Sequence, residues 1–390
     1  MENNFNLENE LFPNELKLLL EILAIEKEEE YDYFSNYSFR EIDWKLFLQL
    51  VMHHRVYPII YLKLKTLDEK IIPQFVILTL YKEYQKNTYS MLALCREMEQ
   101  ISNLFTENHI PILFLKGPVI AADIYGDISL RTSKDLDILV PMNTLHKADK
   151  LLLSFGFGKT TGPYILNEWK WRTHHIVYFH PERNIQLEIH WRLQPLPSSE
   201  PGFNELWERK RVSTITSYPV YFLGKEDLFF FLISHGSRHA WSRLRWLLDI
   251  DKIVRSGINL NEVNLLLKNY QSIHLVGQAL ILASQLLKTP INEEMKLLNV
   301  KSRSKELAHK ALFVIKDRCL LDTNYYKHYC LSLNSTNLQK IYSFMLLFYP
   351  NSADAMTLRL PKSLHFLYFP LRPFLWVFRK TRVKPGISQN

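Results

Sequence analysis

The 390-residue chain is long enough for two or three domains with hydrophobic cores of their own. Hydrophobic residues make up 47% of it and aromatic residues 13%, which excludes a disordered chain, and its three cysteines lack the CxxC spacing of a zinc ribbon. The formal charge of +8 favours polyanionic partners such as nucleotides, but it is scattered along the chain, so nucleic acid is not favoured. The polar N-terminus and the lack of a long apolar run predict a cytoplasmic protein.

Residues 1–108 predict an N-terminal helical module. Asp43 is placed to cap one helix, and a second helix is expected to begin near Pro58. A long helix is then expected from about Pro73 to Glu107, after which the chain enters its first strand.

Residues 111–141 organise the rest of the chain. Two short apolar runs, 112–115 and 136–140, predict buried strands with a short helix between them. Side chains alternate along a strand, so Asp135 and Asp137 should share one face. Neighbouring carboxylates repel each other unless a cation lies between them, and Mg²⁺ prefers oxygen ligands and bridges to phosphates. This pair is therefore a candidate metal and nucleotide site; the alternative is that both carboxylates only solvate the end of a strand.

A hairpin is expected downstream, where two alternating runs are separated by the turn residues PERN. In its second arm, Glu188 and His190 point to the polar face of the strand. His174 and His175 open the first arm, and we expect them at the far end of the strand rather than beside Glu188.

Residues 225–345 predict a C-terminal helical domain that opens with one helix of about 28 residues. On that helix, His235, His239 and Asp249 lie within about 80° of one another, so they share a stripe. Asp249 would orient an imidazole or pair with Arg245 one turn earlier. The stripe is either the wall of a cleft or a buried network that ties the helix to the core.

Two further regions complete the expected organisation. Residues 109–224 should form an α/β core between the helical regions, and residues 346–390 form a tail that is rich in aromatic and basic residues. The tail could make weak contact with a membrane surface. It could instead fold back as an aromatic cap on the helical domain, which we favour.

Several motifs together resemble a known family. They are LKG, YGD, Arg131 four residues before Asp135, DLDILV, LEIHW and SHGSRHAWSRLRWLLDI, and they span roughly residues 40–255. They resemble a bacterial family of uncharacterised nucleotidyltransferases within the DNA polymerase β-like nucleotidyltransferase superfamily. The resemblance implies an α+β fold, with a small polymerase β-like mixed sheet flanked by N-terminal and C-terminal helical domains.

The sequence departs from the superfamily pattern at two positions. The turn after the first strand is commonly Gly-Gly or Gly-Ser, and here it is Gly117-Pro118, which lacks a hydroxyl and one backbone donor. The position before the first aspartate is usually small, and here it is Lys134, which could hold a phosphate or crowd the pocket. Neither change removes a carboxylate.

The resemblance implies transfer of a nucleotidyl group from a nucleoside triphosphate such as ATP, with Mg²⁺ or Mn²⁺ as cofactor. It assigns catalysis and metal binding to Asp135, Asp137 and Glu188. The candidate donor-binding residues are Lys116, Gly117, Arg131, Ser133 and Lys134. The candidate acceptor-side residues are His190, His235, His239, Arg245 and Asp249.

The acceptor is expected to be a peptide, a glycan or a small molecule, because some relatives are associated with natural-product biosynthesis. One rival is a tailoring enzyme that transfers from a nucleotide sugar to a peptide natural product, phosphorylated or not. Another is a non-catalytic nucleotide sensor or a toxin–antitoxin component. The three retained carboxylates argue against a module that only binds.

Overall fold

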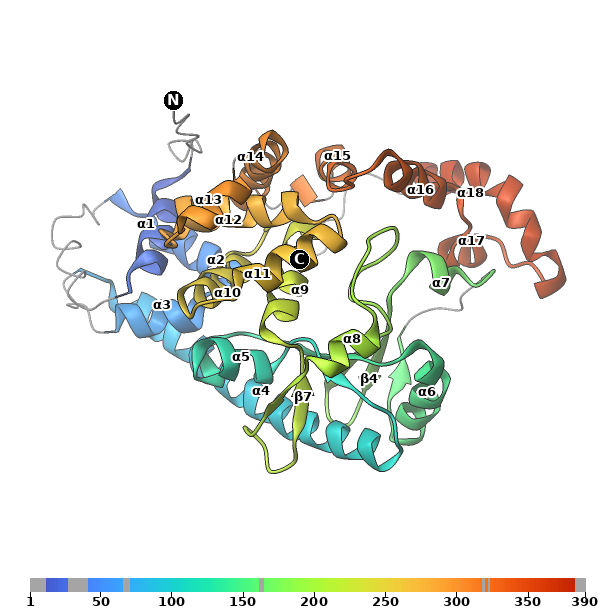
Figure 1. Cartoon of the computed structure of the whole chain (residues 1–390), viewed down its shortest axis with the longest axis horizontal. Coiled ribbons are helices and arrows are strands. Elements are labelled where there is room, and N and C mark those ends of the chain that lie inside the picture. Colours follow the sequence, from blue (N-terminus) through green and yellow to red (C-terminus); the bar gives the residue numbers. More distant parts are fainter. Residues whose placement is uncertain are drawn as a thin grey trace.

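The computed structural model describes residues 12–26, 41–65, 71–160, 165–299, 301–317, 320–321 and 323–382 (Figure 1). The polar N-terminal segment 1–11, on which the cytoplasmic prediction rests in part, lies outside these ranges, as does the end of the tail, 383–390. The predicted α+β class is confirmed: a mixed sheet is flanked by helices from both ends of the chain.

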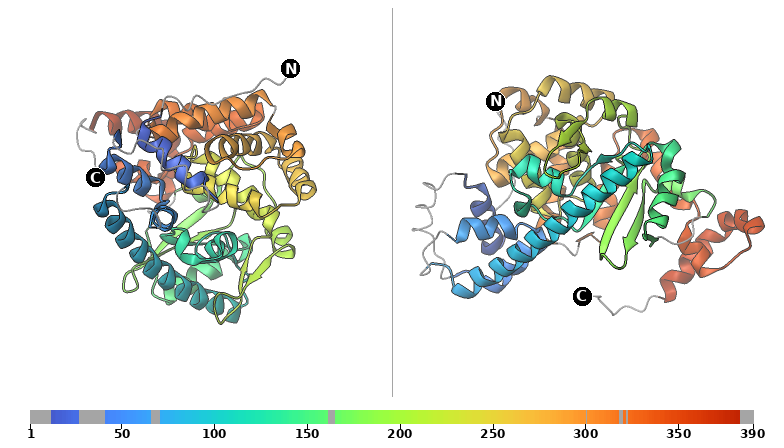
Figure 2. Two further views of the ribbon diagram at one scale, coloured as in Figure 1. Left: turned by 90° about the vertical axis from the view of Figure 1, so that its left-hand side faces the viewer. Right: turned by 90° about the horizontal axis from the view of Figure 1, so that it is seen from below.

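The N-terminal helices form as the sequence predicts. They are α1 (Asn14–Ala24), α2 (Trp44–His54), α3 (Tyr57–Leu64) and α4 (Gln74–Glu107). The Asp43 carboxylate caps α2 by accepting hydrogen bonds from the backbone N–H groups of Lys45 and Leu46, at 2.9 and 3.1 Å. The long helix α4 packs against β2 and β7 and runs beside the sheet (Figure 2).

The sheet has seven strands in the order β3-β4-β5-β2-β1-β7-β6. They are β1 (Leu113–Phe114), β2 (Asp135–Leu139), β3 (Gly158–Lys159), β4 (His175–His180), β5 (Ile185–His190), β6 (Arg211–Ser213) and β7 (Val220–Phe222). The expected hairpin is present, because β4 and β5 pair antiparallel. At the centre, β2 is parallel to β5 and antiparallel to β1.

Four short helices connect the strands. They are α5 (Pro118–Tyr125), α6 (Leu145–Ser154), α7 (Glu168–Arg172) and α8 (Phe203–Glu208). Gly117, which caps α5, has a φ of 93°, and a Cβ atom there would lie 3.2 Å from a methyl group of Leu136. Only glycine fits this turn, which brings Lys116 beside the start of β2.

The prediction of a single helix from residue 225 is wrong. Two helices are present, α9 (Lys225–Arg238) and α10 (Leu244–Arg255), and Ala240 and Trp241 between them have φ values of 50° and 53°. The break is held by packing, because the Trp241 side chain is buried against Gly236, where an added Cβ would meet the ring at 2.4 Å. The turn lets the two helices cross the core in different directions.

The remaining helices form the C-terminal part of the structure. They are α11 (Leu260–Asn269), α12 (Ile273–Leu287), α13 (Glu293–Asn299), α14 (Ser302–Lys316), α15 (Asn324–Ser332), α16 (Asn337–Phe348), α17 (Ser352–Thr357) and α18 (Tyr368–Arg382). No helix in the described ranges is long and apolar enough to cross a membrane.

The prediction that the tail folds back as an aromatic cap on the helical domain is wrong for most of the tail. Tyr368 and Leu375 of α18 pack in a small separate core with Ile165, while Phe366 and Phe374 face solvent. The helices α16 and α18 lie at the end of the molecule farthest from α1 (Figure 1).

Candidate active site

The carboxylates predicted from the DxD motif lie at the centre of the sheet. In the parallel pair of β2 and β5, Asp137 is the direct partner of Glu188, so both side chains point to the same face. Asp135 lies two residues before Asp137 and shares that face. The register therefore puts all three carboxylates on one side of the sheet, as the alternation pattern predicted.

Asp137 is fully buried, and only one of its two carboxylate oxygens has a partner among the described residues. Its Oδ1 atom accepts from Lys116 Nζ at 3.1 Å and from His190 Nε2 at 3.0 Å. Its Oδ2 atom is buried and has no hydrogen-bond partner in the described part of the chain. Burial alone would raise the pKa of Asp137, but the Lys116 charge and the His190 hydrogen bond outweigh it and hold the pKa below its usual value.

The pKa of Asp135 is shifted in the opposite direction. Burial and the negative charge of Asp137 raise the pKa of Asp135 to about 6, and Lys116 only partly offsets this effect. Two neighbouring carboxylates with pKa values pushed apart indicate a site where negative charge is concentrated beyond what the protein itself compensates. A divalent cation would relieve that repulsion.

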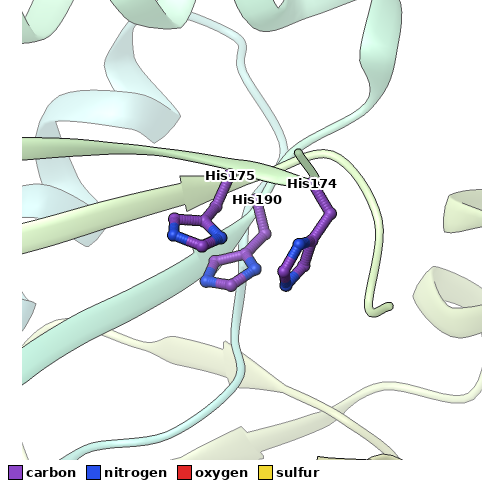
Figure 3. Close-up of side chains that lie close together, drawn as sticks. All are labelled: His174, His175 and His190. Carbon is purple, nitrogen blue, oxygen red and sulfur yellow. The ribbon is translucent and has the colours of Figure 1, made fainter. Parts of the chain in front are cut away.

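The histidines next to the carboxylates form a cluster of three rings, His174, His175 and His190 (Figure 3). The rings of His175 and His190 are stacked with centroids 4.9 Å apart, and His174 lies 5.3 Å from His190. His175 Nε2 is 3.7 Å from a Glu188 carboxylate oxygen. The expectation that His174 and His175 lie away from Glu188 is therefore wrong, because hairpin pairing places the first residue of β4 opposite the last residue of β5.

The protonation of this cluster follows from its neighbours. Burial would lower the pKa of His190, but hydrogen bonds to Asp137 and Glu188 raise it above the usual value. Burial and the adjacent His190 lower the pKa of His175 to about 4, which keeps that ring neutral. A ring with a raised pKa and a ring that is kept neutral therefore lie side by side next to Glu188.

Within the described ranges, two sets of side chains have atoms close enough to share a metal ion. The sets are Asp137, Glu188 and His190, and His174, His175 and His190, each with its ligand atoms within 4.8 Å of one another. The oxygen-rich set suits Mg²⁺ or Mn²⁺, and the unpartnered Oδ2 of Asp137 offers a free ligand atom. Two of the three predicted metal ligands, Asp137 and Glu188, are thus brought together with His190, whereas Asp135 lies on the same sheet face but is in neither set. The donor atoms of the oxygen-rich set fit the predicted metal.

Arg131, predicted to contact phosphate, lies elsewhere. It is fully buried and donates from Nε and Nη2 to the two carboxylate oxygens of Asp249, both at 2.9 Å. The Tyr125 hydroxyl donates to the same carboxylate at 2.8 Å. Arg131 therefore joins the chain that leads into β2 to α10.

Two other predicted residues are also held by backbone contacts. Arg245 donates through Nη1 to the backbone carbonyl and hydroxyl of Thr132, instead of pairing with Asp249. Ser133 donates its hydroxyl to the backbone oxygen of Asp135 at 3.1 Å. Both fix the chain that leads into β2, so they position the carboxylates.

Sequence reasoning missed a group of positive side chains beside Asp135. Arg55, at the end of α2, and Arg243, in the turn before α10, surround the exposed Lys134. The charge of Arg55 is the main reason why the pKa of Lys134 is lowered, and burial followed by Arg55 lowers the pKa of Arg243 to about 10. Cations that repel one another beside a candidate metal ligand are an arrangement that favours an anion.

The histidines expected on the acceptor side, His235 and His239, lie together against Trp246. His235 and His239 are 4.7 Å apart between ring centroids, and both rings contact Trp246. Arg238, which the sequence places on or beside the same stripe, donates to His235 Nδ1 at 3.3 Å and to His174 Nε2 at 3.1 Å. Despite the break after α9, this arginine links the predicted stripe to the histidine cluster.

The fold and the site together describe an enzyme that handles a polyanionic substrate at a row of carboxylates. The family described as uncharacterised nucleotidyltransferase matches residues 40–288, and this chain belongs to it. The match covers α2 to α12 and so includes every residue of the site described above. The protein is thus a nucleotidyltransferase. No curated protein matches the chain.

Proposed function

We propose that this nucleotidyltransferase moves a nucleotidyl group from a nucleoside triphosphate such as ATP to a polar acceptor, with Mg²⁺ or Mn²⁺ held by Asp135, Asp137 and Glu188. The observation that carries the proposal is the shared sheet face of the three carboxylates, together with the unpartnered Oδ2 of Asp137. When bound, a divalent ion supplies charge stabilisation at the phosphoryl oxygens and lowers the pKa of the attacking group.

The residues around the carboxylates fix their orientation. His190 donates to Asp137 at 3.0 Å and lies 3.3 Å from Glu188, so one imidazole holds both carboxylates in place. Lys116 supplies positive charge at Asp137. When a bound cation neutralises Asp137, the Lys116 ammonium contacts a phosphate oxygen of the donor instead.

The donor phosphates are assigned to the positive group formed by Arg55, Lys134 and Arg243. An anion there would offset the repulsion from Arg55 that lowers the pKa of Lys134 and, after burial, that of Arg243. The Gly117-Pro118 turn lacks a hydroxyl, and these three side chains provide the phosphate contacts that such a turn cannot.

The acceptor is assigned to a cavity of about 230 Å³ on the other side of Arg238. Its wall carries hydroxyl and amide groups, including those of Ser234, Asn334 and Gln339. Arg238 both lines this cavity and donates to His174, so the cavity adjoins the histidine cluster. Such a wall suits a glycan, a peptide or a small polar molecule, as in natural-product tailoring, and such donors and acceptors meet in the cytoplasm.

The proposal is tested by intact-mass analysis of acceptor mixtures incubated with the full chain, Mg²⁺ and each nucleoside triphosphate in turn. We expect a mass shift equal to one nucleoside monophosphate, lost on adding a chelator. A shift equal to a sugar, seen only with a nucleotide sugar, would overturn the proposal in favour of glycosyl transfer. Failure of the wild-type chain to bind any triphosphate in the presence of Mg²⁺ would overturn it in favour of another role.

A further inference from the structure

The tail helix α18 exposes an apolar side to solvent, unlike an ordinary surface helix. The side that faces the protein is apolar at Tyr368 and Leu375 and also carries the buried Arg372. The solvent side is apolar too, because Phe369, Phe374 and Val377 are exposed there, with Phe374 73% exposed. A surface helix of a globular protein buries its apolar stripe and exposes its charged one. The apolar side of α18 is therefore available to a partner.

Helix α16 also exposes apolar side chains to solvent. Leu338, Ile341 and Met345 point outward, and Leu338 is 78% exposed. The half-buried side carries Gln339 and Ser343, which line the cavity next to Arg238. At 100° per residue, the three exposed side chains fall within about 60° of one another, so they form a continuous apolar stripe.

A buried ion cluster holds the tail in this orientation. Asp354 is fully buried and accepts from Arg379 Nη1 at 2.7 Å and from Arg372 Nη1. Arg372 also donates to the backbone oxygen of Leu347 at 2.7 Å, which ties α18 to the end of α16. Turning the apolar sides inward would break these buried pairs, which is costly because it leaves unpaired charges.

The charge of the tail indicates what covers the apolar stripes. From residue 337 to 390 the sequence has eight lysines and arginines and one acidic residue, Asp354. Lys340, Arg359 and Lys362 are exposed beside the apolar side chains, whereas the Asp354 carboxylate is buried. A surface that is both apolar and positively charged matches an anionic lipid surface. A second copy of the chain would bring positive charge against positive charge.

We propose that α16 and α18 bind the surface of an anionic lipid bilayer and lie in its interface without crossing it. The exposed phenylalanine, leucine and methionine side chains enter the acyl boundary, and Lys340, Arg359 and Lys362 contact lipid phosphates. Arg172 of α7 donates to the backbone oxygens of Leu346 and Tyr349, at 2.7 and 3.0 Å.

This anchor connects the tail to the catalytic region. The chain continues from α7 directly into His174 and His175, so a docked tail fixes how the site faces the bilayer. Together with the proposed function, on which this step rests, the arrangement directs the enzyme to acceptors held at a membrane surface.

The experiment is co-sedimentation of the full chain with vesicles of phosphatidylcholine alone and of an equimolar mixture with phosphatidylglycerol. We expect binding to the mixed vesicles that weakens as salt is added, and much weaker binding to phosphatidylcholine. The double variant Phe344→Glu/Phe374→Glu should bind about a hundredfold more weakly, since each buried phenylalanine contributes roughly tenfold. The control Tyr89→Glu changes an exposed aromatic residue on α4, 71% exposed and outside the tail, and should bind like wild type.

Two results would overturn the proposal. One is equal binding of the double variant and wild type to the mixed vesicles. The other is a wild-type chain that ignores vesicles but forms a dimer in sedimentation velocity, which the double variant abolishes; this would make a second copy the partner. Vesicle binding is measured without nucleotide, so its failure leaves the proposed function intact, and a failed transfer assay leaves the membrane result intact.

Discussion

Two buried groups of charged side chains lie in the core of this protein, and they differ in how completely they are paired. In the first group, Asp249 receives two hydrogen bonds from Arg131 and one from Tyr125, so its charge is neutralised. In the second, Asp137 has one unpartnered buried oxygen within the described ranges and a second carboxylate, Asp135, beside it. A paired group stabilises the fold, whereas excess charge of one sign marks a place for a ligand.

The largest effect is expected at the unpaired group. Asp137→Asn should lower Mg²⁺-dependent transfer on the order of 10³-fold, about 4 kcal/mol in activation free energy, because it removes a metal ligand. It should lower the free energy of unfolding less than Asp249→Ala does, because asparagine keeps an acceptor oxygen for Lys116 and His190. Turnover and urea denaturation on the same preparation check both values; wild-type turnover would contradict the metal role.

At the paired group of Asp249 and Arg131, a substitution should lower stability rather than activity. Asp249→Ala leaves the Arg131 guanidinium buried without its partner, and we expect a loss of about 3–5 kcal/mol in the free energy of unfolding. Triphosphate affinity per folded molecule should stay at the wild-type value. If the variant kept its stability but lost triphosphate binding, the distinction between scaffold and site would be wrong.

A smaller effect is expected at the positive group beside Asp135. Arg55→Ala should weaken triphosphate binding by about tenfold, equivalent to about 1.4 kcal/mol, because one phosphate contact is lost. Isothermal titration with a non-hydrolysable triphosphate measures the affinity. The matched control, Lys150→Ala, removes one exposed positive charge on α6 and should leave the affinity unchanged. Equal affinities for the two variants would remove Arg55 from the donor site.

The smallest effect concerns pH. Burial and the charge of Asp137 raise the pKa of Asp135 to about 6 from the ordinary 3.8. Between pH 3.8 and about pH 6, Asp135 is therefore protonated in the native chain and ionised in the unfolded chain. The metal-free protein should therefore become less stable as pH rises through this window, and metal affinity should fall as pH drops below about 6. Asp135→Asn should flatten the stability profile; an unchanged profile would mean that another group titrates.

The carboxylate face could be predicted from the sequence because strand alternation is a local property. It places Asp135 and Asp137 on one side, and the same rule places Glu188 on the polar side of β5. The capping of α2 by Asp43 was equally local and is confirmed.

The rest depended on contacts between distant residues. Arg131 and Asp249 are 118 positions apart, so no local pattern pairs them. The break after α9 contains no proline or glycine, because Ala240 and Trp241 are held in the left-handed region by packing of the Trp241 ring. The position of His175 beside Glu188 followed from pairing each residue across the hairpin, which the motif alone did not specify.

The central claim is that the carboxylates on the shared face of β2 and β5 hold a divalent metal. The most direct test is electron paramagnetic resonance of Mn²⁺ bound to the full chain with a non-hydrolysable triphosphate, comparing Glu188→Gln with Glu182→Gln. Both variants lose one carboxylate from the same hairpin, but Glu182 is exposed in its turn. We predict that Glu188→Gln binds Mn²⁺ about tenfold or more weakly, while Glu182→Gln binds like wild type. Equal Mn²⁺ binding by wild type and both variants would contradict the claim.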